Sequence, residues 1–158
     1  MLNVKYLVMD VDGTLTDGKV YIGLNGESFK AFNIKDGCGI HDILIPAGII
    51  PIIMTGRKSE IVEIRCKELG IREIYQAVKD KTTKLISMID DLSKVAYIGD
   101  DINDLSCMKK VKEAGGLVGC PQDAVKEVAD IADYVAVHKG GEGAVRDFIE
   151  WMLFVYQG

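Results

Sequence analysis

The sequence predicts an α/β fold, in which a parallel sheet carries helices on both faces and a β-hairpin flap follows the first strand. Short apolar runs alternate with segments of helical periodicity along almost the whole chain, the order expected of right-handed β-α-β units. The run Ile49–Met54 is almost entirely apolar, as in a strand covered on both faces. The 158 residues, 48% of them hydrophobic, are enough for a single domain over residues 1–158.

The first strand and the hairpin lie at the start of the chain. Val4 to Met9 is apolar, and the run stops abruptly at Asp10. The segment Lys19–Ile34 places Asn25-Gly26 between two β-prone runs, which is typical of a hairpin. Its apolar side chains occur on both faces, and an isolated hairpin is barely stable in water. We therefore expect it to pack on its own domain or on another subunit.

Apolar periodicity and capping residues predict the remaining elements in order. Buried stripes are expected to reach Ala47 in the first helix, Leu92 in the third and Val155 in the last. Helices are expected to begin near Asp36, Ser59, Lys81, Asp101, Asp123 and Gly143. Strands are expected at Ile49–Met54, Glu73–Tyr75, Val95–Ile98, Gly116–Gly119 and Tyr134–Val137.

Charge and composition exclude several classes of function. The net charge is −5 and no basic block stands out, so we expect no nucleic-acid partner. The longest apolar run is far too short to span a bilayer, so we expect no membrane partner. The four cysteines form no C-x-x-C pair, and the chain begins without a signal-peptide pattern. These features predict a cytoplasmic protein with reduced thiols.

Polar residues follow several of the predicted strands. Asp10 and Asp12 follow the first strand, Thr55 follows Ile49–Met54, and Asp100 follows Val95–Ile98. Lys81 stands at a helix start after another short strand. Because ligands bind at the carboxyl ends of the strands in such sheets, we expect these groups to form one site.

The residue types in this set point to phosphoryl chemistry. Two carboxylates about 4 Å apart repel by roughly 4 kcal/mol at an effective dielectric near 20, and a hard cation such as Mg²⁺ offsets this. One carboxylate can act as a nucleophile and another as a general acid. A hydroxyl, a lysine and backbone N–H groups suit phosphate oxygens. Taken alone, Asp-x-Asp-Gly is equally consistent with a simple turn.

Four segments resemble the motifs of the haloacid dehalogenase superfamily of phosphatases, whose fold is Rossmann-like. Asp10-Val-Asp-Gly-Thr-Leu-Thr resembles the first motif, and Thr55 in Met-Thr-Gly-Arg resembles the second. Lys81 looks like the third and Gly99-Asp-Asp-Ile-Asn-Asp like the fourth. Their order and spacing fit, and the resemblance covers the whole chain.

The closer resemblance is to the small capless branch that includes 3-deoxy-D-manno-octulosonate 8-phosphate phosphatase. It is carried by Asp17-Gly18, Gly26-Glu27 with Lys30-Ala-Phe-Asn, Lys35-Asp-Gly, Thr55-Gly-Arg-Lys and the segment Gly140–Arg146. The resemblance implies an enzyme that hydrolyses the terminal phosphate of an 8- or 9-carbon keto-deoxy sugar acid, in lipopolysaccharide or sialic acid biosynthesis. It also implies a homotetramer assembled through the hairpin Lys19–Ile34.

The same resemblance assigns roles to the acidic residues. Asp10 would attack phosphorus and become an aspartyl phosphate. Asp12 would protonate the leaving sugar oxygen and then activate water. Mg²⁺ would be held by Asp10, the backbone carbonyl of Asp12, and Asp100.

The resemblance further assigns the groups that would bind the substrate. Thr55, Gly56 and Lys81 would hold the phosphoryl group. Asp101 would orient Lys81 or a metal-bound water. Arg57 is a candidate for the sugar carboxylate, because a guanidinium fork suits that shape.

Other readings stay open at this point. A phosphatase of the same fold with another small phosphorylated substrate is the first alternative. A phospho-acceptor receiver domain is less favoured, because no Asp ends the strand Ile49–Met54. A catalytically idle assembly protein is disfavoured because none of the expected catalytic residues is missing. Asp104 could be only a helix-start acid, and Arg57 and Arg146 could form ordinary ion pairs.

Overall fold

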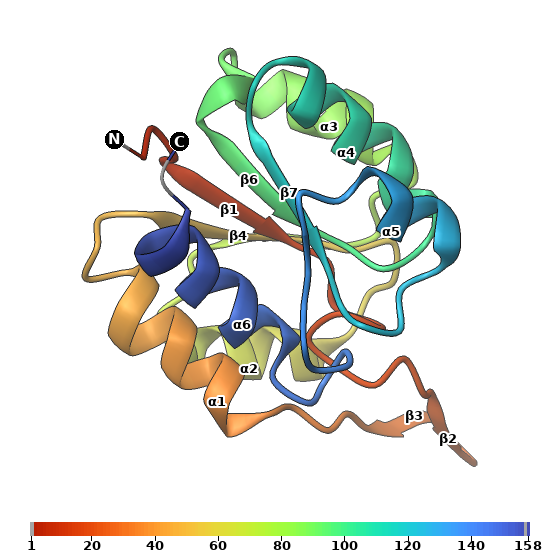
Figure 1. The fold of residues 1–158 in the computed structure, drawn as a ribbon. Coiled ribbons are helices and arrows are strands. Elements are labelled where there is room, and N and C mark those ends of the chain that lie inside the picture. The colour runs from red at the N-terminus through yellow and green to blue at the C-terminus, as the bar shows by residue number, and fades with distance from the viewer. Residues whose placement is uncertain (1, 157) are drawn as a thin grey trace.

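The computed structural model describes residues 2–156 and 158, and its centre is a six-stranded sheet (Figure 1). The strand order is β5-β4-β1-β6-β7-β8, and every neighbouring pair is parallel. This confirms the predicted fold class. The strands are β1 Tyr6–Met9, β4 Ile50–Met54, β5 Glu73–Tyr75, β6 Val95–Ile98, β7 Leu117–Cys120 and β8 Tyr134–Val135.

Helices cover both faces of the sheet (Figure 1). One core lies between the sheet and α1, α2 and α6, and includes Leu44, Val62 and Phe148. The other lies between the sheet and α3, α4 and α5, and includes Leu85 and Met108. The α-helices are α1 Ile34–Cys38, α2 Glu60–Leu69, α3 Lys81–Met88, α4 Ile102–Glu113, α5 Lys126–Ile131 and α6 Ala144–Glu150. Shorter helical turns of other pitch are η1 Gly39–Leu44, η2 Leu92–Lys94 and η3 Trp151–Val155.

The predicted hairpin is present as a separate two-stranded sheet, with β2 at Tyr21–Gly23 and β3 at Gly26–Phe29. Gly26 has φ +106°, a conformation that glycine adopts without strain. The hairpin projects from the body of the molecule (Figure 1). Ile22 and Leu24 are exposed on it, by 69% and 106%.

Several predicted helix limits are wrong. The first helix begins at Ile34, because Asn33 caps it by accepting a hydrogen bond from the backbone N–H of Lys35. The stripe expected to reach Ala47 stops earlier, since Ala47 is exposed. Val155, predicted to be buried, is 62% exposed in η3. Periodicity alone does not fix these ends, because helix ends fray and depend on local capping contacts.

The third helix is also shorter than predicted. It ends at Met88, and Ile89 already has an extended backbone. Leu92, predicted to continue its stripe, begins the separate turn η2. The side chain of Asp91 accepts hydrogen bonds from the backbone N–H and the hydroxyl of Ser93. Such local side-chain bonds compete with helix continuation. The helix predicted from about Asp123 to Ala129 is α5, which begins three residues later and ends two residues later, at Lys126–Ile131.

Candidate active site

Asp10 and Lys81 form the buried centre of the site. Asp10 follows β1, and its backbone N–H donates to the carbonyl of Ile98 in β6 at 3.2 Å. Lys81 is the first residue of α3, and its Nζ donates to Asp10 Oδ1 at 3.0 Å. Both side chains are almost fully buried. Burying an ammonium is costly unless it is paired, so the contact between Lys81 and Asp10 holds both side chains in place.

Asp104 is the second acidic partner of Lys81. Its Oδ1 accepts from Lys81 Nζ at 2.9 Å and from the Tyr97 hydroxyl at 2.7 Å. Its Oδ2 accepts from the backbone N–H of Asp100 at 3.1 Å. Asp104 is therefore more than a helix-start acid. Asp101 was expected from the sequence to orient Lys81 or a metal-bound water. Among the described residues it forms no hydrogen bond or ion pair with Lys81, and it caps α4 by accepting from the backbone N–H of Ile102.

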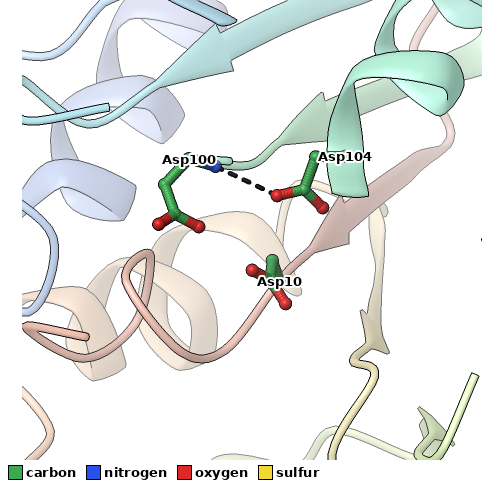
Figure 2. A group of neighbouring side chains, drawn as sticks. All are labelled: Asp10, Asp100 and Asp104. Carbon is green, nitrogen blue, oxygen red and sulfur yellow. Dashed lines mark hydrogen bonds between the residues drawn. The ribbon is translucent and has the colours of Figure 1, made fainter. Parts of the chain in front are cut away.

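Three carboxylates meet beside this lysine (Figure 2). Asp10, Asp100 and Asp104 each offer one oxygen, and these oxygens lie within 4.8 Å of one another. Burial, reinforced by the charge of Asp104, raises the pKa of Asp10 to about 6. Burial and the charge of Asp10 raise the pKa of Asp100 to about 8. The cluster has more negative charge than Lys81 offsets, and an all-oxygen set of this kind suits a hard divalent cation.

Lys81 remains the charged member of the cluster. Burial opposes its charge, but the carboxylates of Asp10 and Asp104 outweigh burial and raise the pKa of Lys81. The ammonium is therefore present whenever the carboxylates are ionised, and it is held against Asp10 Oδ1.

Gly13 allows Asp100 to approach the loop after β1. It has φ +87°, and a Cβ at this position would lie 2.0 Å from Asp100 Oδ2. The next residue, Thr14, donates its hydroxyl to Asp100 Oδ1 at 3.2 Å. The glycine of Asp-x-Asp-Gly thus makes room for a carboxylate from a distant segment, which a simple turn would not require.

A cleft of about 250 Å³ opens above the cluster. The segments that follow β1, β4 and β6 line this cleft, as expected from the sequence. Lys81 contacts Asp10 but is not among the residues that line the cleft, and the side chain of Arg57 is 51% exposed. The residues that line the cleft are Asp10, Asp12, Gly18, Thr55, Gly56, Arg57, Asp100, Asp101 and Asn103.

The loop that carries Thr55 and Arg57 is held by the segment after β5. Thr55 donates its backbone N–H to Tyr75 and accepts at its carbonyl from Val78, at 3.0 and 3.1 Å. The backbone N–H of Ala77 donates to the Arg57 carbonyl at 3.1 Å. Ala77 has φ 55°, in the left-handed region. The position of the Thr55–Arg57 loop therefore depends on a strained neighbouring turn.

Sequence reasoning assigned no role in the site to two charged residues of the hairpin, Glu27 and Lys30. Lys30 Nζ lies 2.6 Å from Asp12 Oδ1 and 2.9 Å from Glu27 Oε2. Glu27 Oε1 accepts from the hydroxyl of Ser59 at 2.6 Å. The available signal was a single lysine between Phe29 and Phe32, which indicates a cation drawn into apolar surroundings. It served in the sequence analysis only as part of a family motif.

Comparisons with known proteins agree on one group of relatives. The chain is 42% identical over 155 residues to 3-deoxy-D-manno-octulosonate 8-phosphate phosphatase of Escherichia coli, a match that covers 96% of this chain and 80% of the relative. No protein-family model matches the chain.

Solved structures give the same picture. The phosphatase of that name from Moraxella catarrhalis, in complex with magnesium ion, phosphate ion and a KDO molecule, has a TM-score of 0.89 and 38% identity, covering 96% of this chain and 87% of that one. A hydrolase of the HAD superfamily, subfamily III A, from Legionella pneumophila has a TM-score of 0.83 and 35% identity, covering 96% and 83%.

Proposed function

This chain belongs to the 3-deoxy-D-manno-octulosonate 8-phosphate phosphatase family of the haloacid dehalogenase superfamily, and from that premise we infer that it is a Mg²⁺-dependent phosphatase of keto-deoxy sugar acid phosphates. Membership confirms the resemblance drawn from the four motifs. The observation that carries the inference is that Asp10, Asp100 and Lys81, from three distant segments, meet at one point. A receiver domain and an idle assembly protein are set aside, because the family consists of phosphoric monoester hydrolases.

Asp10 is the proposed nucleophile. Its carboxylate attacks phosphorus, the bond from phosphorus to the sugar oxygen breaks, and an aspartyl phosphate forms. Asp12, which faces the same cleft, gives its proton to the leaving oxygen and then takes a proton from the water that hydrolyses the intermediate. Removing one such group typically costs about 10²–10⁴-fold in rate.

Asp10, Asp100 and the backbone carbonyl of Asp12 are the proposed ligands of Mg²⁺. Asp104 belongs to the same cluster, but both of its oxygens already accept hydrogen bonds from the protein. It is therefore assigned to Lys81. Bound magnesium would stabilise the negative charge that develops on the transferring phosphoryl group.

Thr55, Gly56 and Lys81 are the proposed phosphate-binding groups. Thr55 and Gly56 line the cleft, and Lys81 contacts Asp10, which lines it as well. Arg57, whose side chain is half exposed in the cleft, is proposed to bind the sugar carboxylate.

Assembly and location are proposed on separate grounds. The exposed apolar side chains of the hairpin Lys19–Ile34 support a homotetramer built through that segment. The four cysteines are free thiols, which supports the cytoplasm. Within the described residues, no helix is long and apolar enough to cross a membrane. We also propose that residues 1–158 act as one catalytic domain.

Phosphate release measured side by side on octulosonate 8-phosphate, nonulosonate 9-phosphate and unrelated sugar phosphates tests the assignment. We expect Mg²⁺-dependent turnover of a sugar acid phosphate to exceed that of the unrelated esters by at least about tenfold, which is about 1.4 kcal/mol. Asp10→Asn should abolish turnover of every ester, while Asp90→Asn, on the surface, should not change it. Comparable rates on all esters would favour a phosphatase of another small metabolite.

A further inference from the structure

The side chain of Lys30 is buried, although it belongs to a hairpin whose apolar side chains are largely exposed. Its side chain is 2% exposed, although Ile22, Leu24 and Phe29 of the same hairpin lie open on the surface. It turns away from them toward two carboxylates, Asp12 at 2.6 Å and Glu27 at 2.9 Å. A lysine loses hydration and rotamer freedom when buried, so these two contacts must define its position.

The contacts join three parts of the chain. Glu27, on β3, also accepts from Ser59 at the start of α2 and lies 3.7 Å from Arg57. Lys30, which contacts Glu27, also donates to Asp12 in the loop after β1. The hairpin is thereby tied to the loops after β1 and β4 through one ammonium group.

The geometry at Asp12 is asymmetric. Its Oδ1 is held by Lys30, while Oδ2 accepts no hydrogen bond from the described residues and lies 3.9 Å from Arg57 Nε. Asp12 also lines the cleft. One oxygen is thus fixed and the other is left for exchange of a proton with a group in the cleft.

We propose that Lys30 is a positioning residue, which holds the Asp12 carboxyl so that Oδ2 faces the leaving oxygen of the substrate. This rests on the proposed function. In the step concerned, the bond from phosphorus to the sugar oxygen breaks and the proton of Asp12 forms the new O–H bond of the released alcohol. A misplaced Asp12 leaves that oxygen to depart without its proton, which matters for an alkoxide and little for a stable phenolate.

Comparison of two esters tests the proposal. The kcat/KM of the full-length protein with Mg²⁺ is measured on octulosonate 8-phosphate, which has an alkoxide leaving group, and on p-nitrophenyl phosphate, which has a stable one. Lys30→Met should lower kcat/KM for the sugar phosphate by about tenfold or more and for the aryl ester by less than about threefold. Lys30→Arg, which keeps the charge, should recover part of the loss. Lys67→Met, on the exposed surface of α2, is the matched control and should match wild type.

Each result has one meaning. Equal losses on both esters, no loss, a gain, or an arginine variant no better than the methionine variant would overturn the role of Lys30. Thermal unfolding distinguishes a misfolded variant from one with a mispositioned Asp12. We expect Lys30→Arg to have the same melting temperature as wild type, so any loss of its activity is not a loss of folding. An inactive wild type on the sugar acid phosphate would count against the proposed function instead, and the aryl ester would show whether phosphatase activity is present at all.

Discussion

At the scale of the residue, Ala77 carries a backbone conformation that its side chain disfavours. Its φ of 55° costs an L-residue about 1–2 kcal/mol, and glycine adopts this φ without that cost. Glycine also has the larger conformational entropy in the unfolded chain, which cancels part of the gain. We expect Ala77→Gly to raise the free energy of unfolding by about 0.5–1 kcal/mol, measured by urea denaturation. Ala129→Gly, within α5, should lower it by about 1 kcal/mol.

The same residue bears on the site. The backbone N–H of Ala77 donates to the Arg57 carbonyl, so relief of strain should leave that bond in place and the KM for the sugar acid phosphate unchanged. A destabilised Ala77→Gly variant would show that the turn is not strained. A raised KM in a stabilised variant would show that the strain itself places Arg57.

At the scale of the element, α6 is capped by another helix. Its own N-cap residue is Gly143, which has no side chain, and Asp36 of α1 accepts from the backbone N–H of Arg146 at 2.9 Å. Burial raises the pKa of Asp36 to about 6, although the hydrogen bond from Arg146 and the nearby backbone N–H groups of Gly143 and Val145 oppose the rise. The start of α6 is thus joined to α1 by a carboxyl group whose pKa is about 6.

The pH dependence follows from that shift. The folded protein holds the Asp36 proton more tightly than the unfolded chain, where the pKa is about 4. Its contribution to stability is therefore complete below about pH 4 and is lost as pH rises through about 6. We expect the unfolding free energy of wild type, minus that of Asp36→Asn, to fall by about 2–3 kcal/mol from pH 4 to 7. If the difference in unfolding free energy stays flat or rises between pH 4 and 7, the raised pKa of Asp36 is contradicted. The variant Asp90→Asn, at an exposed position, controls for the change from carboxylate to amide.

At the scale of the whole molecule, the hairpin offers the surface that we propose for assembly. Ile22 and Leu24 are exposed by 69% and 106% in the single chain, and burying each in a neighbour would contribute about 1.5–3 kcal/mol. We expect Ile22→Lys with Leu24→Lys to shift the protein from tetramer toward monomer in sedimentation velocity at micromolar concentration. Ile86→Lys, at a 50% exposed position of α3, should leave the assembly unchanged.

The sedimentation result also bears on the site. Glu27 and Lys30 belong to the same hairpin, which the neighbouring subunits would support in the proposed tetramer. Loss of assembly should therefore lower the phosphatase activity. A wild-type monomer with full activity would rule out the tetramer, while a tetramer that survives both lysine substitutions would place its interface elsewhere on the chain.

The sequence by itself determined the alternation of strands and helices, the edge of the sheet that carries the site, and the residues Asp10, Asp12, Thr55, Arg57 and Asp100 that meet in the cleft. These follow from local periodicity and from chain direction, because each of these residues lies at most three positions beyond the end of a buried strand.

Only the tertiary structure decided which charges face each other. It paired Lys81 with Asp104, gave Asp12 a partner in Lys30, and capped α6 with Asp36. It also ended α3 at Met88. Contacts between segments tens of residues apart depend on the side-chain directions and packing of whole elements, which no local pattern of residues encodes.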